Sequence, residues 1–572
     1  MISAVPAMRS AFGVIGSSTV DALRPSSAPM AWGPAIRTLT VVAAILLAGA
    51  VFGALDVVGI AYLGAACAVA FVQTQTYRAV LTALVFQAVG AVVGLGIAAL
   101  TPDTPVALVL TATVVAGVSG AIGSLSPAAP GFGMMLSIGL AFGQFGQSPV
   151  PWWAQCSWYL AGTVAVGAVW LWPWLFDSGA GSKEAAAVFD AAADLCEAIG
   201  GPDMAVARAR LAAAWATAQA GRRNIRAELA GFAAAALFAE GTEVPAAAVA
   251  ALRRAAEDAR SGDVRTTEFV ELPATTPGLS ALADAFSDAP KRFPGSANLP
   301  FADRAAAASR SLRSREVLDA SVRLGVSMGV ATAVSSALHG AAHSFWLPLT
   351  VAVIMRPEYA SIFVRTVNRV AGTVVGAVCA AAILLVAPAG VGVAIGAACA
   401  LAVGVLLAPK LYALSVIGVT AAALLASSIG TVDVVLPLVR LFDTSLGALI
   451  AIVIGYALWP SARRMSDAGR LRRAADAADA YLSAAVGGSR PALQLPRDDA
   501  YRSAHLARQS AERASAEPPP VNRVALEQLP YTIRLEQLID EITRLVATVD
   551  AGGDVGAEAQ RIGEQIEEIR GH

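Results

Sequence analysis

The chain has few charged residues and few of the residue types that bind metals or carry nucleophilic chemistry. Only 15% of its 572 residues are charged, and it contains five cysteines and four histidines. No two cysteines form a C-x-x-C pair, so neither a disulfide framework nor a thiolate metal site is indicated. Walker, zinc and nucleophile motifs are also absent, which argues against an ATP-driven pump or an intramembrane protease. We therefore expect no enzymatic activity, no metal and no cofactor.

Charge of one sign is not in excess either. The formal net charge is −1, which provides no overall field to attract nucleic acid, and we expect no nucleic-acid partner. Apolar surface is abundant instead, since 56% of the residues are hydrophobic and the mean hydropathy is +0.62. This exceeds what the core of a soluble protein needs. The composition therefore predicts an integral membrane protein whose solvent is the lipid bilayer.

Long apolar runs occur in two blocks of six. A helix needs about 20 apolar residues to cross a hydrocarbon core of roughly 30 Å, and these runs approach that length. They lie near residues 36–55, 57–73, 80–100, 105–125, 131–147 and 156–176, and near 320–338, 344–357, 366–387, 389–408, 411–429 and 436–459. The predicted fold class is an all-α membrane protein of about twelve transmembrane helices in two halves.

Polar, alanine-rich segments lie between and after the two blocks. We predict a cytoplasmic tail over residues 1–34, a first transmembrane half over 35–177, a helical cytoplasmic domain over 178–318, a second transmembrane half over 319–460 and a C-terminal helical cytoplasmic domain over 461–572. The first segment has no convincing small-residue cleavage site, so a tail is favoured over a signal peptide.

Arginine and lysine predict the orientation, because they accumulate in short loops and at helix ends on the cytoplasmic side. With a cytoplasmic N-terminus, that side receives Arg37, Arg78, Lys183, Arg323, Arg356, Arg365, Lys410, Arg463 and Arg464, whereas the opposite loops carry Asp56, Asp103 and Asp433. Arg440 is the one cation on the other side. Both termini and both soluble domains are then expected on the cytoplasmic face of the plasma (inner) membrane.

An internal repeat relates the two blocks. Segments 63–94 and 345–376 align without gaps at an offset of 282 residues, so that Tyr77 falls on Tyr359. The same alignment places Gly90 and Gly94 on Gly372 and Gly376, and each block ends in Trp-Pro. With six spans per half, both halves enter the membrane from the same side. We therefore expect a parallel repeat about an axis along the membrane normal, as in some transporters.

The second span of the later block is short and interrupted. It contains Pro348 and ends at Arg356-Pro357, and interrupted segments in matching positions of two repeats point to a midplane binding site. The alternative is a short tilted span at a helix hairpin.

The following helix carries arginines and glycines on one stripe. Arg365, Arg369, Gly372 and Gly376 recur at i, i+4, i+7 and i+11, with Asn368 beside them. Glycines four apart allow close helix packing, and an arginine on such a stripe can hold a carboxylate in a fork of donors. The alternative is that these arginines only anchor the cytoplasmic helix end. At the matching place the first block has Gln87, so any anion site is asymmetric.

The last span carries two ionisable residues near its start. Arg440 and Asp443 lie three apart, and ionisable groups at membrane depth are costly and are candidates for function. Asp443 is the candidate for a coupling proton, with Arg440 beside it; the alternative is a structural ion pair near the outer interface. Gly447, Ala451 and Gly455 continue a small-residue face suited to tight packing.

The stretches SFWLPLTVAVIMRPEYASIFVRTVNRVAGTVVG and VRLFDTSLGALIAIVIGYALWP resemble the fusaric acid resistance family of membrane proteins. That family includes bacterial aromatic acid exporters and is similar to plant aluminium-activated malate transporters. The residues that match its pattern are Trp346, Arg369, Gly372, Thr373, Gly376, Arg440, Asp443, Thr444 and Trp459-Pro460. In the first half the motif arginine is Gln87 and the Asp-Thr pair is absent. The resemblance implies efflux of aromatic or other organic acids, driven by the proton gradient.

The sequence therefore predicts a secondary exporter of small organic carboxylates, aromatic ones among them. The expected substrate-binding residues are Trp346, Arg356, Tyr359, Arg365, Asn368 and Arg369, with Tyr77 and Arg78 in the first half. Asp443 and Arg440 are expected to couple protons, and Gly90, Gly94, Gly372, Gly376, Gly447 and Gly455 to pack helices. A passive organic-anion channel of the same fold and a membrane scaffold or envelope-assembly factor are the alternatives. The glycine-rich faces also leave room for a homo-oligomer.

Overall fold

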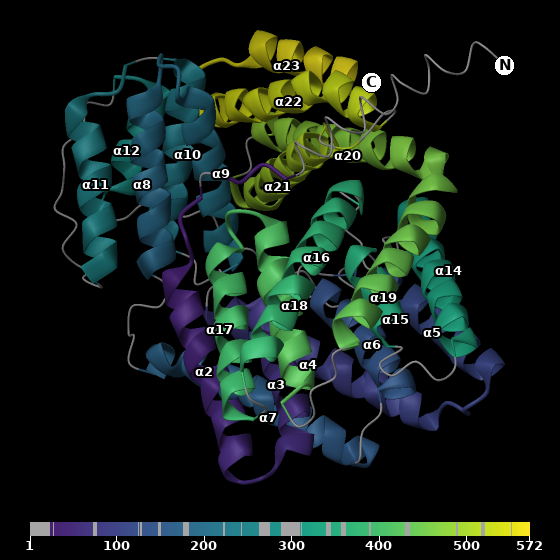
Figure 1. The fold of residues 1–572 in the computed structure, drawn as a ribbon. Helices are drawn as coiled ribbons and strands as arrows, with labels where there is room; N and C mark the ends of the chain where they lie inside the picture. The colour runs from purple at the N-terminus through teal and green to yellow at the C-terminus, as the bar shows by residue number, and fades with distance from the viewer. Residues whose placement is uncertain are drawn as a thin grey trace, which may run out of the picture. The chain divides into compact units, whose positions relative to one another are not determined.

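The computed structural model describes residues 23–572 except 27, 73–76, 124, 126–128, 147–149, 176–181, 221–223, 242, 262–274, 288–308, 310–311, 339–344, 356–361, 388–389, 430–434, 488–489, 516, 518–520 and 551. These described residues form helices and no strand, which confirms the all-helical class (Figure 1). The chain divides into two compact units. Unit 1 comprises Met1–Pro173, Arg304–Arg463 and Ala516–Pro520, and unit 2 comprises Trp174–Asp303, Arg464–Ser515 and Val521–His572.

Unit 1 holds an apolar helix for each of the twelve predicted runs. In the first block they are α2 (Trp32–Val51), α3 (Leu55–Phe71), α4 (Tyr77–Leu100), α5 (Pro105–Ile122), α6 (Ala129–Phe145) and α7 (Trp152–Leu171), followed by the 3-10 turn η1 (Trp172–Leu175). In the second block they are α14 (Arg315–Ala337), α15 (Trp346–Ile354), α16 (Ile362–Val386), α17 (Val391–Leu407), α18 (Tyr412–Ser427) and α19 (Leu436–Ile450), which continues into the π-helical segment η2 (Ala451–Ala457).

The helix lengths refine the predicted number of spans. Within the described residues, six helices are long and apolar enough to cross a membrane, namely α2, α4, α5, α14, α16 and the α19–η2 helix. Four others, α3, α6, α17 and α18, are apolar but shorter, and α15 has nine residues. Helix α7 has 20 residues but is not among the six. The chain is therefore a membrane protein with twelve helices at the predicted places, six of which are both long and apolar enough to cross a membrane.

Capping residues explain where several of these helices begin. The Thr104 hydroxyl accepts a hydrogen bond from the backbone N–H of Ala107, and Pro105 occupies the first position of α5. Ser314 caps α14 in the same way by accepting from the N–H of Val317. A side-chain acceptor there satisfies an N–H that the helix itself leaves open.

Helices at matching positions of the two blocks have matching neighbours in unit 1. Helix α4 packs on α6 and α7, and α16 packs on α18 and α19. Helix α3 packs on α7, and α15 packs on α19. Between the blocks, α5 packs on α14, and α17 packs on α2.

Glycines allow the closest of these contacts. A Cβ on Gly94 of α4 would lie 2.7 Å from the backbone nitrogen of Leu140 on α6. A Cβ on Gly376 of α16 would lie 2.7 Å from the carbonyl oxygen of Ile417 on α18. Similar approaches occur at Gly90 to α6, Gly372 to α18, Gly447 to α15 and Gly455 to the Met355 side chain. At Gly90, Gly94, Gly372 and Gly376 the neighbouring atoms include backbone, so a side chain there would force the helices apart.

Unit 2 is built from both polar segments of the chain. The segment between the blocks supplies α8 (Ser182–Ala198), α9 (Met204–Ala220), α10 (Ile225–Glu240), α11 (Ala246–Ser261) and α12 (Pro277–Ala285). The C-terminal segment supplies α20 (Pro460–Val486), which begins in unit 1, and α21 (Arg490–Ser515), α22 (Val521–Asp550) and α23 (Gly556–Arg570).

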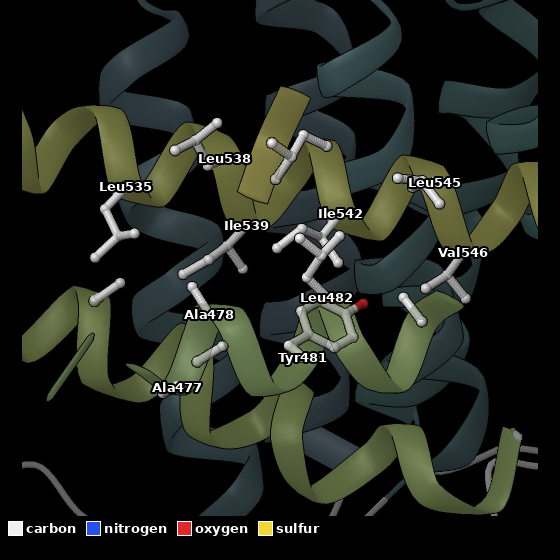
Figure 2. Packing of buried hydrophobic residues seen from close by; sticks show 14 of the residues in the cluster. Ala477, Ala478, Tyr481, Leu482, Leu535, Leu538, Ile539, Ile542, Leu545 and Val546 are labelled. Atoms are coloured by element: carbon white, nitrogen blue, oxygen red, sulfur yellow. The ribbon is translucent and has the colours of Figure 1, made fainter. Parts of the chain in front are cut away.

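One hydrophobic core joins the two polar segments of unit 2. Figure 2 shows its C-terminal part, where Tyr481 and Leu482 of α20 meet Ile539 and Ile542 of α22. Trp215, Leu229 and Phe232 of α9 and α10 belong to the same buried cluster. The two polar segments, predicted as separate domains, therefore share this core, and the segment between the blocks has a second buried cluster of its own.

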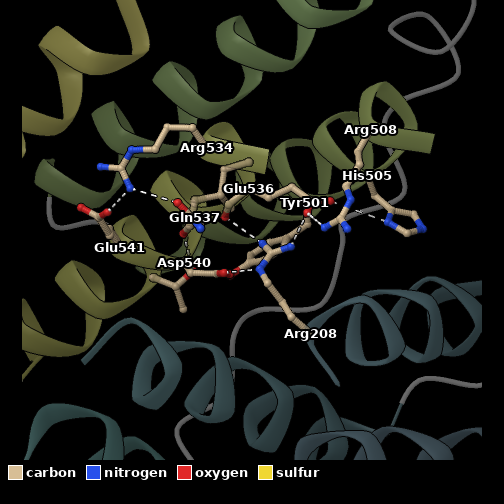
Figure 3. Close-up of polar contacts among 11 residues, drawn as sticks. Arg208, Tyr501, His505, Arg508, Arg534, Glu536, Gln537, Asp540 and Glu541 are labelled. Atoms are coloured by element: carbon tan, nitrogen blue, oxygen red, sulfur yellow. Dashed lines mark hydrogen bonds and ion pairs between the residues drawn. The ribbon is translucent and has the colours of Figure 1, made fainter. Parts of the chain in front are cut away.

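A buried polar cluster also joins these two segments. Figure 3 shows Arg208 of α9 reaching Glu536 and Asp540 of α22, with Tyr501 and Arg508 of α21 beside them. The Tyr501 hydroxyl donates to the Asp540 carboxylate at 2.9 Å, and Arg508 donates to the Glu536 carboxylate at 2.9 Å. The cluster therefore connects one helix of the segment between the blocks, which we call the insert, to two helices of the C-terminal segment.

Candidate functional site

Three helices of the second block, α15, α16 and α19, carry polar side chains into the interior of unit 1. Arg440 and Asp443 of α19 are 2% and 5% exposed, and Arg369 of α16 is 6% exposed. On α19, Arg440, Asp443, Thr444 and Gly447 recur at i, i+3, i+4 and i+7, so they share the face that packs against α15 and α16. Ionisable groups in such a position are costly and mark candidates for a transport or proton pathway.

Arg440 lies over the ring of Trp346. Its guanidinium carbon is 4.0 Å from the ring centroid, which is a cation–π contact. The Trp346 ring lies 4.4 Å from that of Phe345, and Phe345 meets Phe142 of α6 edge-on at 5.1 Å. A row of aromatic rings therefore supports one face of the guanidinium, while the N–H groups in its plane stay available for a ligand.

Several polar atoms on α15, α16 and α19 are buried and have no hydrogen-bond partner among the described residues. They are Nε and Nη1 of Arg440, Nε of Arg369, Nε1 of Trp346, Oδ2 of Asp443 and the hydroxyls of Thr373 and Thr444. Nearly all buried polar groups in native proteins are paired, and each unpaired one costs roughly 1–3 kcal/mol, more if it is charged. The cluster therefore has the donors to receive an anionic ligand or ordered water.

Helix α16 is oriented by Asn368 and the two glycines. The Asn368 side-chain oxygen accepts from the backbone N–H of Ala413 at 3.0 Å, and its amide donates to the Val364 carbonyl at 2.8 Å. Gly372 and Gly376 pack on the same helix, α18. The predicted stripe is thus divided, since Asn368 and the glycines contact α18 whereas Arg369 is an electrostatic neighbour of Arg440 on α19. Arg365 donates to the Ile354 carbonyl at the end of α15, at 3.5 Å.

Arg440 and Asp443 are electrostatic neighbours. Although they lie three residues apart on one helix, no hydrogen bond or ion pair joins them in the described part of the chain. Each keeps a buried polar atom open. Two guanidinium groups and one carboxylate can therefore engage a bound anion and a proton separately.

The equivalent place in the first block is neutral and internally satisfied. Gln87, which the repeat aligns with Arg369, accepts from the Tyr159 hydroxyl at 2.7 Å and donates to the Thr163 hydroxyl at 3.2 Å. Thr163 in turn donates to the Tyr159 carbonyl at 3.2 Å. All three side chains are buried. The two blocks therefore differ chemically at this place: the first block has the neutral, hydrogen-bonded Gln87, and the second has the charged Arg369, whose Nε lacks a partner among the described residues.

The remaining predicted residues lie elsewhere or outside the described residues. Tyr77 and Arg78 begin α4 and are half-buried and exposed, respectively. Arg356 and Tyr359 fall outside the described residues. Phe142 and Phe345 were not predicted as neighbours of the site; the aromatic pair Phe345-Trp346 at the start of a short helix was the available signal.

Comparison with known proteins confirms the resemblance for the second block. Residues 330–454 match the family model described as fusaric acid resistance protein-like. The matched region includes α15, α16 and the Arg440–Asp443 part of α19, so it contains the whole buried polar cluster. No curated protein and no solved structure matches the chain.

Proposed function

We propose that this membrane protein is a secondary transporter that exports small organic carboxylates, aromatic ones among them, in exchange for protons. The observation that carries the proposal is the set of buried N–H groups on Arg440 and Arg369 without hydrogen-bond partners among the described residues. A carboxylate supplies the planar pair of acceptors that a guanidinium binds best. The family match over the same residues supports a transport role.

In this proposal each polar residue has its own task. Arg365 and Arg369 attract the anion from the cytoplasmic end of α16, and Arg440 holds its carboxylate. Trp346, already stacked on Arg440, offers an aromatic surface to the organic part of the substrate. Asp443 exchanges the coupling proton, since it is an ionisable group at membrane depth whose Oδ2 lacks a partner among the described residues.

The proposed architecture is two six-helix halves related by an axis along the membrane normal. It is supported by the matching neighbours of equivalent helices, above all by the reciprocal pairs α5 with α14 and α17 with α2. The distribution of arginine and lysine supports cytoplasmic termini and a cytoplasmic unit 2 in the plasma membrane. The anion site then lies in one half only, because the other half holds the neutral Gln87 network.

The test is the accumulation of labelled aromatic and aliphatic carboxylates in cells that lack or overexpress the protein, with and without a protonophore. We expect lower accumulation on overexpression and loss of the difference when the protonophore is added. Ohmic carboxylate currents in planar bilayers, independent of a proton gradient, would instead identify a passive channel.

If the accumulation of none of these carboxylates changes, the scaffold alternative is favoured. That alternative also predicts that Arg369→Ala and Asp443→Ala leave cellular function intact, whereas removal of the C-terminal segment 464–572 abolishes it. The transporter proposal predicts the opposite result for the two substitutions, provided that the variants reach the membrane in normal amounts.

A further inference from the structure

The last helix of unit 1 changes its geometry about two turns after the buried polar residues. Helix α19 is α-helical as far as Ile450, and Ala451–Ala457 are π-helical. The N–H of Leu458 accordingly donates to the carbonyl of Val453, five residues earlier, at 3.1 Å. π-Helical turns are rare and occur frequently at functional sites. Each such turn holds one residue more than an α-helical turn, so moving it requires the neighbouring residues to rotate.

Neighbouring helices of unit 1 hold this wide turn in place. Arg323 of α14 is 4% exposed and donates from Nη1 to the carbonyl of Gly455 at 3.5 Å. Met355, at the end of α15, lies so close to Gly455 that a Cβ there would overlap its thioether. Helix α16 also packs on the segment. The elements around the turn are thus the helices that build the polar cluster, together with α14.

We infer that the π-helical segment is a hinge whose movement rotates Asp443 and Thr444 relative to Arg440. Arg323 is the positioning residue that holds the π-helical turn at Gly455. This inference rests on the proposed function, because the site that the hinge regulates is the proposed carboxylate site. When a wide turn moves along a helix, the residues that it passes rotate by about 100°, the rotation per residue of a helix with 3.6 residues per turn. A turn that moves from Ala451 to Asp443 carries Asp443 and Thr444 off the face that they share with Arg440.

The residues between the hinge and the site favour such a movement. Gly447, Ala448 and Ala451 are small and buried, so they sweep little volume when the helix rotates, whereas the buried side chain of Ile450 would have to repack. Gly447 lies against Thr350 and the Leu347 carbonyl of α15, which fixes one packed position for this face. The rotation would move this face out of that packed position and leave the Trp346–Arg440 contact outside the moving stretch.

The first experiment measures hydrogen exchange of α19 and transport for Arg323→Met, Arg323→Lys and the control Arg315→Met. Arg315 is an exposed arginine on the same helix. We expect Arg323→Met to speed exchange of the amides of residues 451–458 at least tenfold and to lower the maximal transport rate at least fivefold with KM within twofold. Lysine, which keeps a charged donor, restores both values, and Arg315→Met changes neither. Unchanged exchange in Arg323→Met would overturn the role of Arg323.

The second experiment locks the hinge. Met355→Cys and Gly455→Cys are introduced together into a chain whose five native cysteines are replaced by alanine. We expect oxidation of this pair to lower transport at least tenfold and a reductant to restore it, with no redox effect in either single-cysteine variant. If the oxidised protein transports as fast as the same protein with both thiols reduced, the hinge is disproved. If the unaltered protein moves no carboxylate, the proposed function fails, yet the exchange measurement still decides whether Arg323 holds the turn.

Discussion

The guanidinium of Arg208 binds Glu536 twice, because its Nη1 donates to the carboxylate at 2.6 Å and its Nη2 donates to the backbone carbonyl at 2.7 Å. Its Nε donates to the Asp540 carboxylate at 2.5 Å. One side chain of the insert therefore uses all three nitrogens on α22, more than 300 residues away in the chain. Since the side chains of Arg208 and Glu536 are only 9% and 4% exposed, this contact sets how the insert docks on the C-terminal segment (Figure 3).

Arg208→Met should loosen unit 2 strongly. Removing one partner of a buried ion pair leaves an uncompensated charge and costs about 3–5 kcal/mol; here Asp540 loses its ion pair, while Glu536 keeps the one with Arg508. The measurement is the free energy of opening of α9 and α22 amides by hydrogen exchange in the purified full chain. The control is Arg210→Met on the same helix, whose ion pair with Asp194 is 3.5 Å long and whose side chain is 66% exposed. That variant should change stability by about 1 kcal/mol or less, and equal effects of the two substitutions would contradict the prediction.

Glu536 should make unit 2 sensitive to acid. Burial by itself raises its pKa, but the hydrogen bond from His505 and the charges of Arg208 and Arg508 lower the pKa from 4.5 to about 2. Because the folded pKa lies below the unfolded one, the ionised form stabilises the fold above pH 4.5, and this contribution is lost as the pH falls from 4.5 to 2. A shift of this size corresponds to about 3 kcal/mol. Unfolding of unit 2 followed between pH 7 and pH 2 should lose much of this pH dependence in Glu536→Gln.

Asp540 offers a matched control with the opposite sign. Burial raises its pKa in spite of the charge of Arg208, so its contribution to stability decreases as the pH rises through that pKa. Asparagine keeps an acceptor for the Tyr501 hydroxyl, which donates to Asp540 at 2.9 Å. Asp540→Asn should therefore destabilise unit 2 less than Glu536→Gln at pH 7 and leave the acid-induced loss below pH 4.5 in place. A loss of that acid dependence in Asp540→Asn would show that the two carboxylates have been assigned the wrong roles.

The helices of unit 1 could be predicted because their signals are local. Apolar run length indicated a helix at each of the twelve places, and glycines four residues apart identified the faces of α4 and α16 that touch a neighbour. The buried face of α19 followed from the three-residue spacing of Arg440 and Asp443. The π-helical segment could not be predicted, since the sequence AIVIGYA is that of an ordinary apolar helix. The wide helical turn depends instead on contacts with Arg323 and Met355.

Contacts between distant segments were the part that the sequence could not predict. The hydrogen bond between Gln87 and Tyr159 and the edge-on contact of Phe142 with Phe345 join segments that are far apart in the chain. Neither leaves a periodic pattern, because each needs only one residue per helix. The joining of the two polar segments through Arg208 is of the same kind. Asn368 shows the converse, since its place beside the arginine stripe suggested substrate contact, whereas the structure engages its amide with backbone groups.

Arg440→Met should weaken carboxylate recognition and leave the fold of unit 1 in place. A hydrogen bond to a charged group contributes about 1.5–3 kcal/mol, so the loss of Arg440 should lower kcat/KM for export at least about tenfold. The kcat/KM of Arg440→Lys should lie between those of the unaltered protein and Arg440→Met, because an ammonium retains the charge but not the planar fork. These values come from initial export rates in proteoliposomes with a proton gradient.

Tyr159→Phe is the control for Arg440→Met, because it removes one hydroxyl from the neutral network of the first block. It should reduce stability by roughly 1 kcal/mol with KM unchanged. A larger effect on KM from Tyr159→Phe than from Arg440→Met would move the substrate site to the first block.

Gly376→Ala should separate α16 from α18 and reduce the yield of folded protein. The new Cβ would lie 2.7 Å from the Ile417 carbonyl oxygen and 3.0 Å from the Thr420 side chain, and backbone cannot yield as a flexible side-chain end can. Overpacking of this kind costs about 1–3 kcal/mol. The control is Gly59→Ala on α3, where a Cβ meets nothing within 4 Å and where alanine favours the helix by roughly 1 kcal/mol over glycine. Thermal unfolding in detergent should therefore shift downward for Gly376→Ala and stay level or rise for Gly59→Ala. Equal changes in the unfolding temperature of the two variants would mean that the α16–α18 contact tolerates an added methyl group. The orientation of Arg369 toward α19 would then need another cause.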